Sequence, residues 1–473
     1  MLITIECVIL ALQAVAAVRL ALHSPIGIDS PSNNRLSKRS PLELGGDVNK
    51  CFKIKVNVDG VDLNLRVDST VSNMVVPLPS SSNDVGLAIQ SISSGEPVSI
   101  KYKGKQYNGV TSTAVVTIPG TGITGVNLPV LAVEKQSADS VGINPKFDGI
   151  FGLAYSSLSN QHSRVTAMDA LYNDGAIPKN EVSLQLCPYG MTSESFINIG
   201  NTDVTAKCET DGTSVAWVES PSNNQFSVNI KSVLVNGRPA ELPAEFQKKV
   251  KDGRTLYSSV ETCFLNMRFP ETVVTALVDA ILNSNAITVK DNMLRSDYLD
   301  KKKIKMRLWK NHLMPRYKYT IDWSRMPRFS ITMFAQTPVT DENRDSVVTI
   351  ELGPRDYMQI ISIENSEKFL FAVTVGSNDY AVLGMSFMTR LKLTFDLQNA
   401  RIGFGSGCGC ETATSEYPTI SNNDRMLWPL PHFGLPEEPS TSYETQYRSI
   451  VLRIGRIRRG SKRSNVDYKK LGD

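Results

Sequence analysis

Two aspartates follow similar apolar runs and could form one acid–base pair. Residues 65–76 read LRVDSTVSNMVV and residues 276–287 read ALVDAILNSNAI, so Asp68 and Asp279 each end an apolar run that we expect to be a strand. Two carboxylates that face each other cannot both ionise easily, and they share a proton. One can then activate a water molecule while the other donates a proton, which is general acid–base hydrolysis.

The pattern continues further along each half of the chain. Asp68 is followed 84 residues later by Gly152, which ends GIFG, and Asp279 is followed 105 residues later by Gly384, which ends AVLG. A glycine at the end of an apolar strand lets another backbone segment pass closely. We therefore expect a duplicated β lobe that contributes one aspartate from each half.

The composition and the pattern of apolar and polar residues are those of a β-rich globular protein. The 473 residues are 41% hydrophobic and 21% charged, which is enough for two lobes with large cores. From about residue 45, β-branched and polar residues alternate between turn residues, and helical periodicity is confined to about 165–176 and 240–251. The net charge of +4 gives no reason to expect a nucleic-acid partner.

The N-terminal residues have the features of a secretory leader and a pro-segment. Residues 1–16 contain an apolar run that ends in Ala-Val-Ala, a pattern suited to signal-peptidase cleavage. A buried helix is the alternative, because Glu6 interrupts the run. Residues 17–45 carry a dibasic pair at 38–39, which predicts a processed pro-segment. We expect a protein that is secreted or enters the endolysosomal pathway, and no later segment is apolar for long enough to span a bilayer.

Six cysteines lie beyond the leader and suit three disulfides in a secreted chain. They are Cys51, Cys187, Cys208, Cys263, Cys408 and Cys410. The residues alone leave the pairing open. A metal site is the competing interpretation, but the sequence has no C-x-x-C pair and no cysteine–histidine cluster, so we expect no metal and no other cofactor.

Two basic segments stand apart from the β-rich texture. Residues 301–318 read KKKIKMRLWKNHLMPRYK, and we expect a solvated surface face there. Residues 412–473 end in a basic tail, for which we expect disorder. A surface helix, or contact with an anionic membrane or glycans, is the alternative for the tail.

Several motifs resemble the pepsin-like aspartic peptidases over about residues 46–411. The strongest is FDGIFGLAYSS at 147–157, supported by VSIKYKGKQYNGV at 98–110 and YAVLGMSFMTRLKLTFDLQNARIGFG at 380–405. SLQLC and FGSGCGC are most similar to the β-secretase branch. The resemblance implies a mostly β, bilobal fold with two pseudo-twofold-related lobes, at 46–205 and 206–411, and a cleft that holds an extended peptide or protein. We expect a monomer.

The resemblance also implies roles for particular residues. Asp68 and Asp279 match the catalytic pair, and Tyr102 matches the tyrosine of a flap that closes over the peptide. The residues that follow the two aspartates would line the substrate site: Ser69, Thr70, Ala280 and Ile281. The implied disulfides join Cys187 to Cys408 or Cys410, Cys263 to the other of these two, and Cys51 to Cys208.

Both copies depart from the family pattern Asp-Thr/Ser-Gly-Ser/Thr. Ala280 cannot donate to a brace between the two loops, and Thr70 and Ile281 place β-branched side chains where glycine is expected. Val71 and Leu282 lack the hydroxyl that would orient each aspartate. We therefore predict a protein that binds extended polypeptide with its hydrolysis impaired or lost. The alternative is an active aspartic endopeptidase with an unusual dyad environment.

Overall fold

A computed structural model describes the parts of the chain that build the lobes. The described residues are 18–22, 51–78, 95–102, 105–119, 121–134, 149–158, 165–186, 195–200, 215–222, 224–251, 253–290, 297–363, 366–406, 418–423 and 425–427. The predicted signal peptide at 1–16, the dibasic pair at 38–39 and the basic end of the tail lie outside them.

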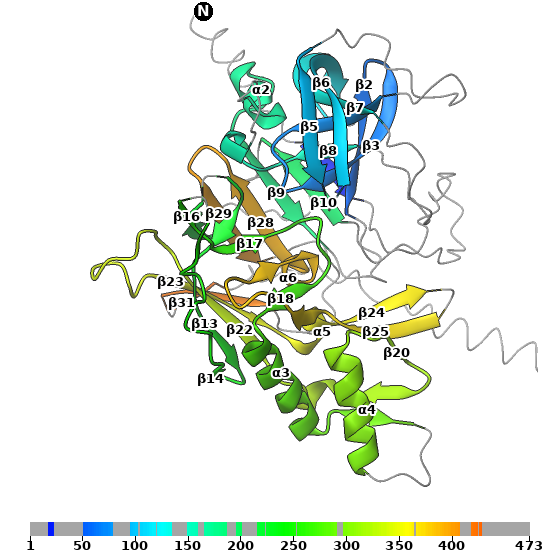
Figure 1. The fold of residues 1–473 in the computed structure, drawn as a ribbon, viewed down its shortest axis with the longest axis vertical. Coiled ribbons are helices and arrows are strands. Elements are labelled where there is room, and N and C mark those ends of the chain that lie inside the picture. Colours follow the sequence, from blue (N-terminus) through cyan, green and yellow to red (C-terminus); the bar gives the residue numbers. More distant parts are fainter. Residues whose placement is uncertain are drawn as a thin grey trace, which may run out of the picture. The chain divides into compact units, whose positions relative to one another are not determined.

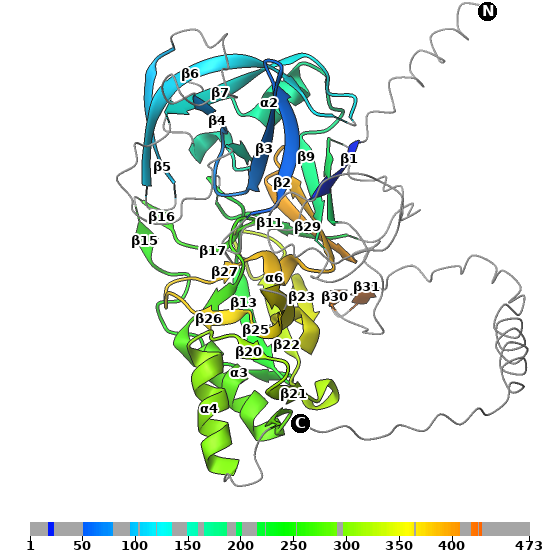
Figure 2. The same cartoon turned by 90° about the vertical axis from the view of Figure 1, so that its right-hand side faces the viewer.

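The N-terminal lobe is a seven-stranded sheet, drawn in blue to teal in Figures 1 and 2. Its strand order is β2-β3-β8-β4-β7-β6-β5. The bounds are β2 (Lys53–Val58), β3 (Val61–Asp68), β4 (Met74–Leu78), β5 (Pro97–Tyr102), β6 (Lys105–Thr117), β7 (Val126–Glu134) and β8 (Ile150–Gly152). Asp59 and Gly60 both adopt positive φ and form the two-residue turn of the β2–β3 hairpin, the backbone that Asp-Gly favours.

Two sheets build the C-terminal lobe. The five-stranded sheet has the order β12 (Ser227–Val228), β17 (Ser258–Val260), β27 (Val382–Leu383), β18 (Met267–Phe269), β26 (Val373–Val375). The six-stranded sheet has the order β14 (Arg238–Pro239), β13 (Ile230–Val235), β22 (Phe329–Phe334), β23 (Val347–Leu352), β30 (Thr419–Asn422), β31 (Arg425–Leu427). Because β30 and β31 extend this sheet, the prediction of a disordered tail from residue 412 was wrong for residues 419–427.

A third sheet joins strands from both halves of the chain. Its order is β1 (Val18–Leu22), β10 (Ser195–Ile199), β9 (Glu181–Gln185), β28 (Leu391–Asp396), β29 (Arg401–Ser406), β11 (Ala216–Glu219). Strand β1 belongs to the predicted pro-segment, and it pairs with β10 along its whole length. The segment is thus held to the body of the protein by backbone hydrogen bonds.

Short two- and three-stranded pairings complete the strands. They are β15 (Val250–Lys251) with β16 (Arg254–Thr255), β19 (Ile287–Val289) with β21 (Tyr319–Ile321), and β20 (Met314–Pro315) with β25 (Ser366–Phe371) and β24 (Met358–Ile363). The helix predicted at 240–251 was wrong, since this region is a turn followed by β15.

The helices are few, as expected for a β-rich fold. They are α2 (Ala167–Asn173), α3 (Glu271–Ser284), α4 (Asp297–Trp309), α5 (Pro354–Tyr357) and α6 (Met385–Met388), with 3-10 turns η1 (Ser156–Leu158) and η2 (Trp323–Arg325). Helix α2 confirms the helix predicted near 165–176 and begins with a capping box of Thr166 and Asp169. Helix α4 carries the first half of the basic segment and contacts α3 (Figure 1). Within the described residues, no helix is both long enough and apolar enough to cross a membrane.

Strand registers reveal the repeat in full. Strand β3 runs parallel to β8 with Val67 opposite Phe151, and β17 runs parallel to β27 with Val260 opposite Leu383. Strands β4 and β18 then flank β8 and β27 on the other side and pair in parallel with β7 and β26. The β-rich, two-lobed fold is therefore confirmed, and the residue that follows β17 is the counterpart of the one that ends β3.

The two glycines singled out in the sequence have the predicted role. A Cβ on Gly152 would lie 2.4 Å from the Val71 carbonyl oxygen, and a Cβ on Gly384 would lie 2.3 Å from that of Asn266. In each lobe a loop passes so close to the short strand that only glycine fits. These two loops, which follow β3 and β17, meet at the candidate site.

Candidate functional site

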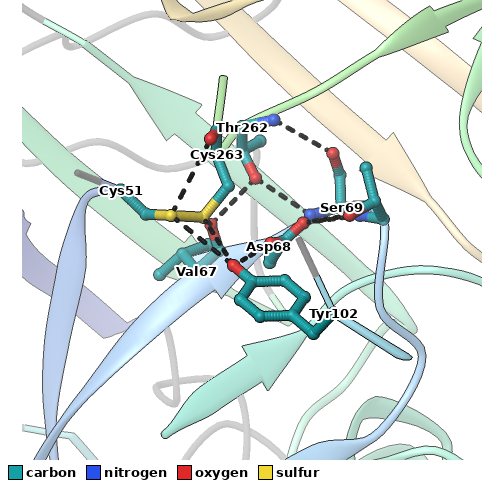
Figure 3. Close-up of a disulfide and its surroundings, with 8 residues drawn as sticks. Cys51, Val67, Asp68, Ser69, Tyr102, Thr262 and Cys263 are labelled. Carbon is teal, nitrogen blue, oxygen red and sulfur yellow. Dashed lines mark hydrogen bonds between the residues drawn. A yellow bond between two sulfur atoms is a disulfide. The ribbon is translucent and has the colours of Figure 1, made fainter. Parts of the chain in front are cut away.

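Asp68 ends β3 and is fully buried with both carboxylate oxygens hydrogen-bonded (Figure 3). The backbone N–H of Thr70 donates to Oδ1 at 2.8 Å, and the Thr70 hydroxyl donates to the same oxygen at 2.7 Å. The hydroxyl of Tyr102 donates to Oδ2 at 2.7 Å. Thr70 was expected to add a β-branched side chain where glycine is usual, and its hydroxyl also supplies the donor that Val71 lacks.

Ser69 and Thr262 brace the two loops together. The Ser69 N–H donates to the Thr262 hydroxyl at 2.9 Å, and the Thr262 N–H donates to the Ser69 hydroxyl at 3.0 Å. Each hydroxyl also donates across the junction, Ser69 to the Val260 carbonyl at 2.7 Å and Thr262 to the Val67 carbonyl at 2.9 Å. The sequence analysis expected half of this brace to be missing, but the second hydroxyl comes from Thr262, so all four bonds form.

Removing one brace hydroxyl should weaken the junction of the loops. In Ser69→Ala the buried Thr262 N–H and Val260 carbonyl both lose their partner, and we expect the free energy of unfolding to fall by about 2 kcal/mol in urea titrations. Ser112→Ala is the matched control, because the Ser112 hydroxyl makes a long, solvent-exposed hydrogen bond of 3.4 Å to the Thr113 carbonyl. It should change stability by less than about 0.5 kcal/mol. Equal effects of the two substitutions would contradict the brace.

Glu261 occupies the position in the second lobe that Asp68 occupies in the first. It follows Val260 at the end of β17 and precedes Thr262, as Asp68 follows Val67 and precedes Ser69. Its N–H donates to the Leu383 carbonyl at 2.9 Å, which continues the pairing with β27. Its Oε1 accepts a 2.7 Å hydrogen bond from the Ser259 hydroxyl. The residue of the second lobe that corresponds to Asp68 is therefore a glutamate, whereas the sequence had indicated Asp279.

Asp279 does not take part in the junction, and its predicted pairing with Asp68 was wrong. It lies within helix α3, where its carboxylate is 46% exposed and accepts a 3.1 Å hydrogen bond from Lys305 of α4. Figures 1 and 2 both place α3 away from the end of β3. Ala280 and Ile281 follow on the same helix, and Ile281 packs in the core and cannot line a substrate site.

A disulfide joins the two lobes beside Asp68 (Figure 3). It links Cys51, just before β2, to Cys263, the residue after Thr262. Cys263 therefore stands where the family pattern has glycine. The predicted pairing of Cys51 with Cys208, and of Cys263 with Cys408 or Cys410, was wrong. Cys187 and those three partners lie outside the described residues, so a bond between Cys187 and Cys408 or Cys410 stays a prediction.

Tyr102 connects the hairpin of β5 and β6 to Asp68 and the disulfide. It ends β5 opposite Lys105 of β6, and its ring is buried. Its hydroxyl oxygen lies 3.8 Å from Cys51 Sγ and 3.7 Å from Cys263 Sγ. Burial raises the pKa of the Tyr102 phenol, and the negative charge of Asp68 raises it further. The phenol is therefore neutral and donates a hydrogen bond to Asp68.

The arrangement buries the Asp68 carboxylate completely, and its two oxygens accept hydrogen bonds from Thr70 and Tyr102. Asp68 could act as a base or acid only if the Tyr102 hydroxyl moved and admitted water. Cys51, Asp68 and Cys263 are also metal-ligating residue types, and their ligand atoms lie within 4.8 Å of one another.

The comparison with protein families agrees with the fold. The sequence model of the eukaryotic aspartyl proteases matches residues 87–407, which is most of the chain. The match includes Tyr102, Gly152, Glu261 and Gly384, and it begins after Asp68 and Ser69. Because the family model matches most of the chain, and because the structure has the repeated lobes and paired loops, this chain belongs to the eukaryotic aspartyl protease family.

Proposed function

We propose that this protein binds extended polypeptides as aspartic proteases do, and that it does not hydrolyse them while its Asp68 pocket is closed. The observation that carries the proposal is that both carboxylate oxygens of Asp68 already accept hydrogen bonds from the protein. Thr70 donates twice to Oδ1 and Tyr102 donates to Oδ2, and the Tyr102 oxygen lies within 3.8 Å of both disulfide sulfurs.

Hydrolysis by two carboxylates needs a water molecule between them. In this protein the side of Asp68 that carries Oδ2 is covered by the phenol and the disulfide. The corresponding residue of the second lobe, Glu261, is longer than an aspartate by one methylene, and its carboxylate accepts a hydrogen bond from Ser259. Because catalysis tolerates positional errors poorly, a shift of about 1 Å costs roughly a hundredfold in rate.

The proposed ligand is an extended segment of another polypeptide. Peptide substrates are the ligands of the aspartyl protease family, and such ligands bind by adding main-chain hydrogen bonds to strands. The β5–β6 hairpin, closed at Tyr102 and Lys105, is the proposed flap over the ligand. We also propose a monomeric, secreted or endolysosomal protein of the β-secretase-like branch, made with a signal peptide and pro-segment.

An active endopeptidase is the second candidate, and one observation favours it. All four hydrogen bonds of the brace between Ser69 and Thr262 are present, and each loop carries an acidic residue next to its brace residue. In this interpretation Asp68 and Glu261 form the acid–base pair after Tyr102 swings away.

The test separates binding from cleavage. Purified protein without residues 17–39 is mixed with a quenched-peptide library between about pH 3 and pH 7, beside Asp68→Asn, Glu261→Gln and the helix variant Asp279→Asn as matched control. Binding of a statine-containing peptide, a mimic of the tetrahedral intermediate, is measured on the same samples. We expect binding without cleavage in all four proteins.

Cleavage that disappears in Asp68→Asn and Glu261→Gln, and persists in Asp279→Asn, would overturn the binding proposal and establish the Asp68–Glu261 enzyme. Failure of a folded protein to bind any peptide would overturn both candidates.

A further inference from the structure

Four side chains with metal-ligating or metal-orienting atoms converge where the lobes are cross-linked. Cys51, Cys263, Asp68 and Tyr102 are all buried, and none is more than 6% exposed. The two sulfurs and a carboxylate oxygen of Asp68 lie within 4.8 Å of one another. The four residues come from four segments, next to β2, β3, β5 and β17, and Figure 3 shows their side chains close together. The convergence explains why Asp68 is blocked, but the binding of a peptide does not itself require sulfur beside Asp68.

We propose that, when the Cys51–Cys263 disulfide is reduced, the same residues bind Zn²⁺ through the two thiolates and the Asp68 carboxylate. Thiolate and carboxylate are ligands that zinc accepts, with bonds of about 2.3 Å and 2.0 to 2.2 Å. Around a tetrahedral ion these bond lengths separate the ligand atoms by roughly 3.5 to 3.8 Å. The two sulfurs and the Asp68 oxygen already lie within 4.8 Å of one another, so zinc binding requires the two sulfurs to separate once their bond is broken.

Reduction of the Cys51–Cys263 disulfide and the binding of zinc balance in electrons and protons. A phosphine or dithiol reductant supplies two electrons, the S–S bond breaks, and two protons convert the sulfurs to thiols. Zinc then displaces both thiol protons, while Asp68 contributes a carboxylate. Two thiolates and one carboxylate around Zn²⁺ leave a net charge of −1, with water in the fourth position.

The surroundings of Asp68 suit a metal-bound carboxylate. Among the described residues, Oδ2 accepts a hydrogen bond from Tyr102 alone, which leaves a lone pair for the ion. Tyr102 and Thr70 donate three hydrogen bonds to the carboxylate and fix its orientation. Such supporting bonds are worth about 10- to 100-fold in metal affinity. In the zinc form the lobes stay connected and Asp68 stays blocked, so the inference is independent of whether the disulfide form binds peptide.

Cobalt is the probe that tests the site. The full chain is reduced anaerobically with a phosphine, the reductant is removed, and Co²⁺ is titrated. We expect the near-ultraviolet thiolate-to-cobalt band and the visible bands of tetrahedral Co²⁺, both lost when stoichiometric Zn²⁺ is added. Cys51→Ala and Cys263→Ala should abolish these bands. Asp68→Asn should weaken Co²⁺ binding about 10- to 100-fold while the thiolate band persists at saturation.

Two matched variants guard against other ligands in the chain. Asp279→Asn removes an aspartate of the distant helix α3, and Cys208→Ala removes a cysteine from outside the cluster, and both should bind Co²⁺ as the wild type does. Bands that survive in the Cys51→Ala, Cys263→Ala double variant would overturn the proposal. A reduced, folded protein that binds no Co²⁺, or a disulfide that cannot be reduced without unfolding, would overturn it as well.

Discussion

Replacing Cys51 and Cys263 together by alanine should lower the free energy of unfolding by about 4 to 5 kcal/mol. The disulfide closes a sequence separation of 212 residues, and a cross-link over so long a loop removes much conformational entropy from the unfolded chain. The bond also ties the strand region of one lobe to the brace loop of the other. Urea unfolding of the oxidised proteins, followed by tryptophan fluorescence, measures the difference.

The single variants provide the control for this prediction. Removing either cysteine breaks the same bond, so Cys51→Ala and Cys263→Ala should each cost nearly as much as the pair. Single losses that are small and add up to the loss of the double variant would show that the two sulfurs are not bonded, and would contradict the cross-link.

The sequence predicted the β-rich, two-lobed fold correctly for identifiable reasons. Alternating β-branched residues and glycine-bearing turns indicated a β-rich protein, and the apolar runs before Gly152 and Gly384 indicated the repeat. The end of β3 at Asp68 was also predicted, because an acidic residue closing an apolar strand is conspicuous.

The counterpart of Asp68 in the second lobe was misplaced because it is a glutamate and not an aspartate. Residues 67–77 read VDSTVSNMVVP and residues 260–270 read VETCFLNMRFP, which share Val, Asn, Met and Pro at the same spacing and an acidic residue before a hydroxyl residue. This repeat pointed to Glu261 and Thr262. Segment 276–287 instead continues a helix, whose buried Val274, Leu277, Val278 and Ile281 recur every three or four residues.

The pairing of Cys51 with Cys263 could not be deduced from the sequence. It depends on the three-dimensional meeting of the segment before β2 with the loop after β17, and cysteine spacing contains no information about that contact. The resemblance to the family was misleading here, because the family has glycine where this chain has Cys263. The same substitution brings sulfur next to Asp68, which is why the site is closed.

Asp356 should make the protein more stable in acid than at neutral pH. It lies in α5, fully buried, where it accepts a 2.8 Å hydrogen bond from the Gly353 N–H, and Arg390 lies 3.6 Å away. Burial outweighs the attraction of Arg390 and the hydrogen bond from Gly353, and raises the pKa of Asp356 from 3.8 to about 6. Between pH 3.8 and about pH 6, Asp356 therefore holds a proton in the folded state that it has lost in the unfolded chain. The free energy of unfolding therefore falls as the pH rises through this range.

The size and sign of this effect can be isolated with Asp356→Asn. A shift of about two pKa units corresponds to about 3 kcal/mol, which is present below the unfolded pKa of 3.8 and is lost as the pH rises through about 6. Between about pH 4 and pH 7, urea unfolding should show the wild type losing about 3 kcal/mol relative to the variant. Asp62→Asn is the opposite control, because the hydrogen bond from Lys55 lowers the pKa of the exposed Asp62, so its contribution is lost as the pH falls. Parallel pH profiles for wild type and Asp356→Asn would mean that Asp356 ionises in the folded protein as it does in the unfolded chain, with Arg390 offsetting the burial in full.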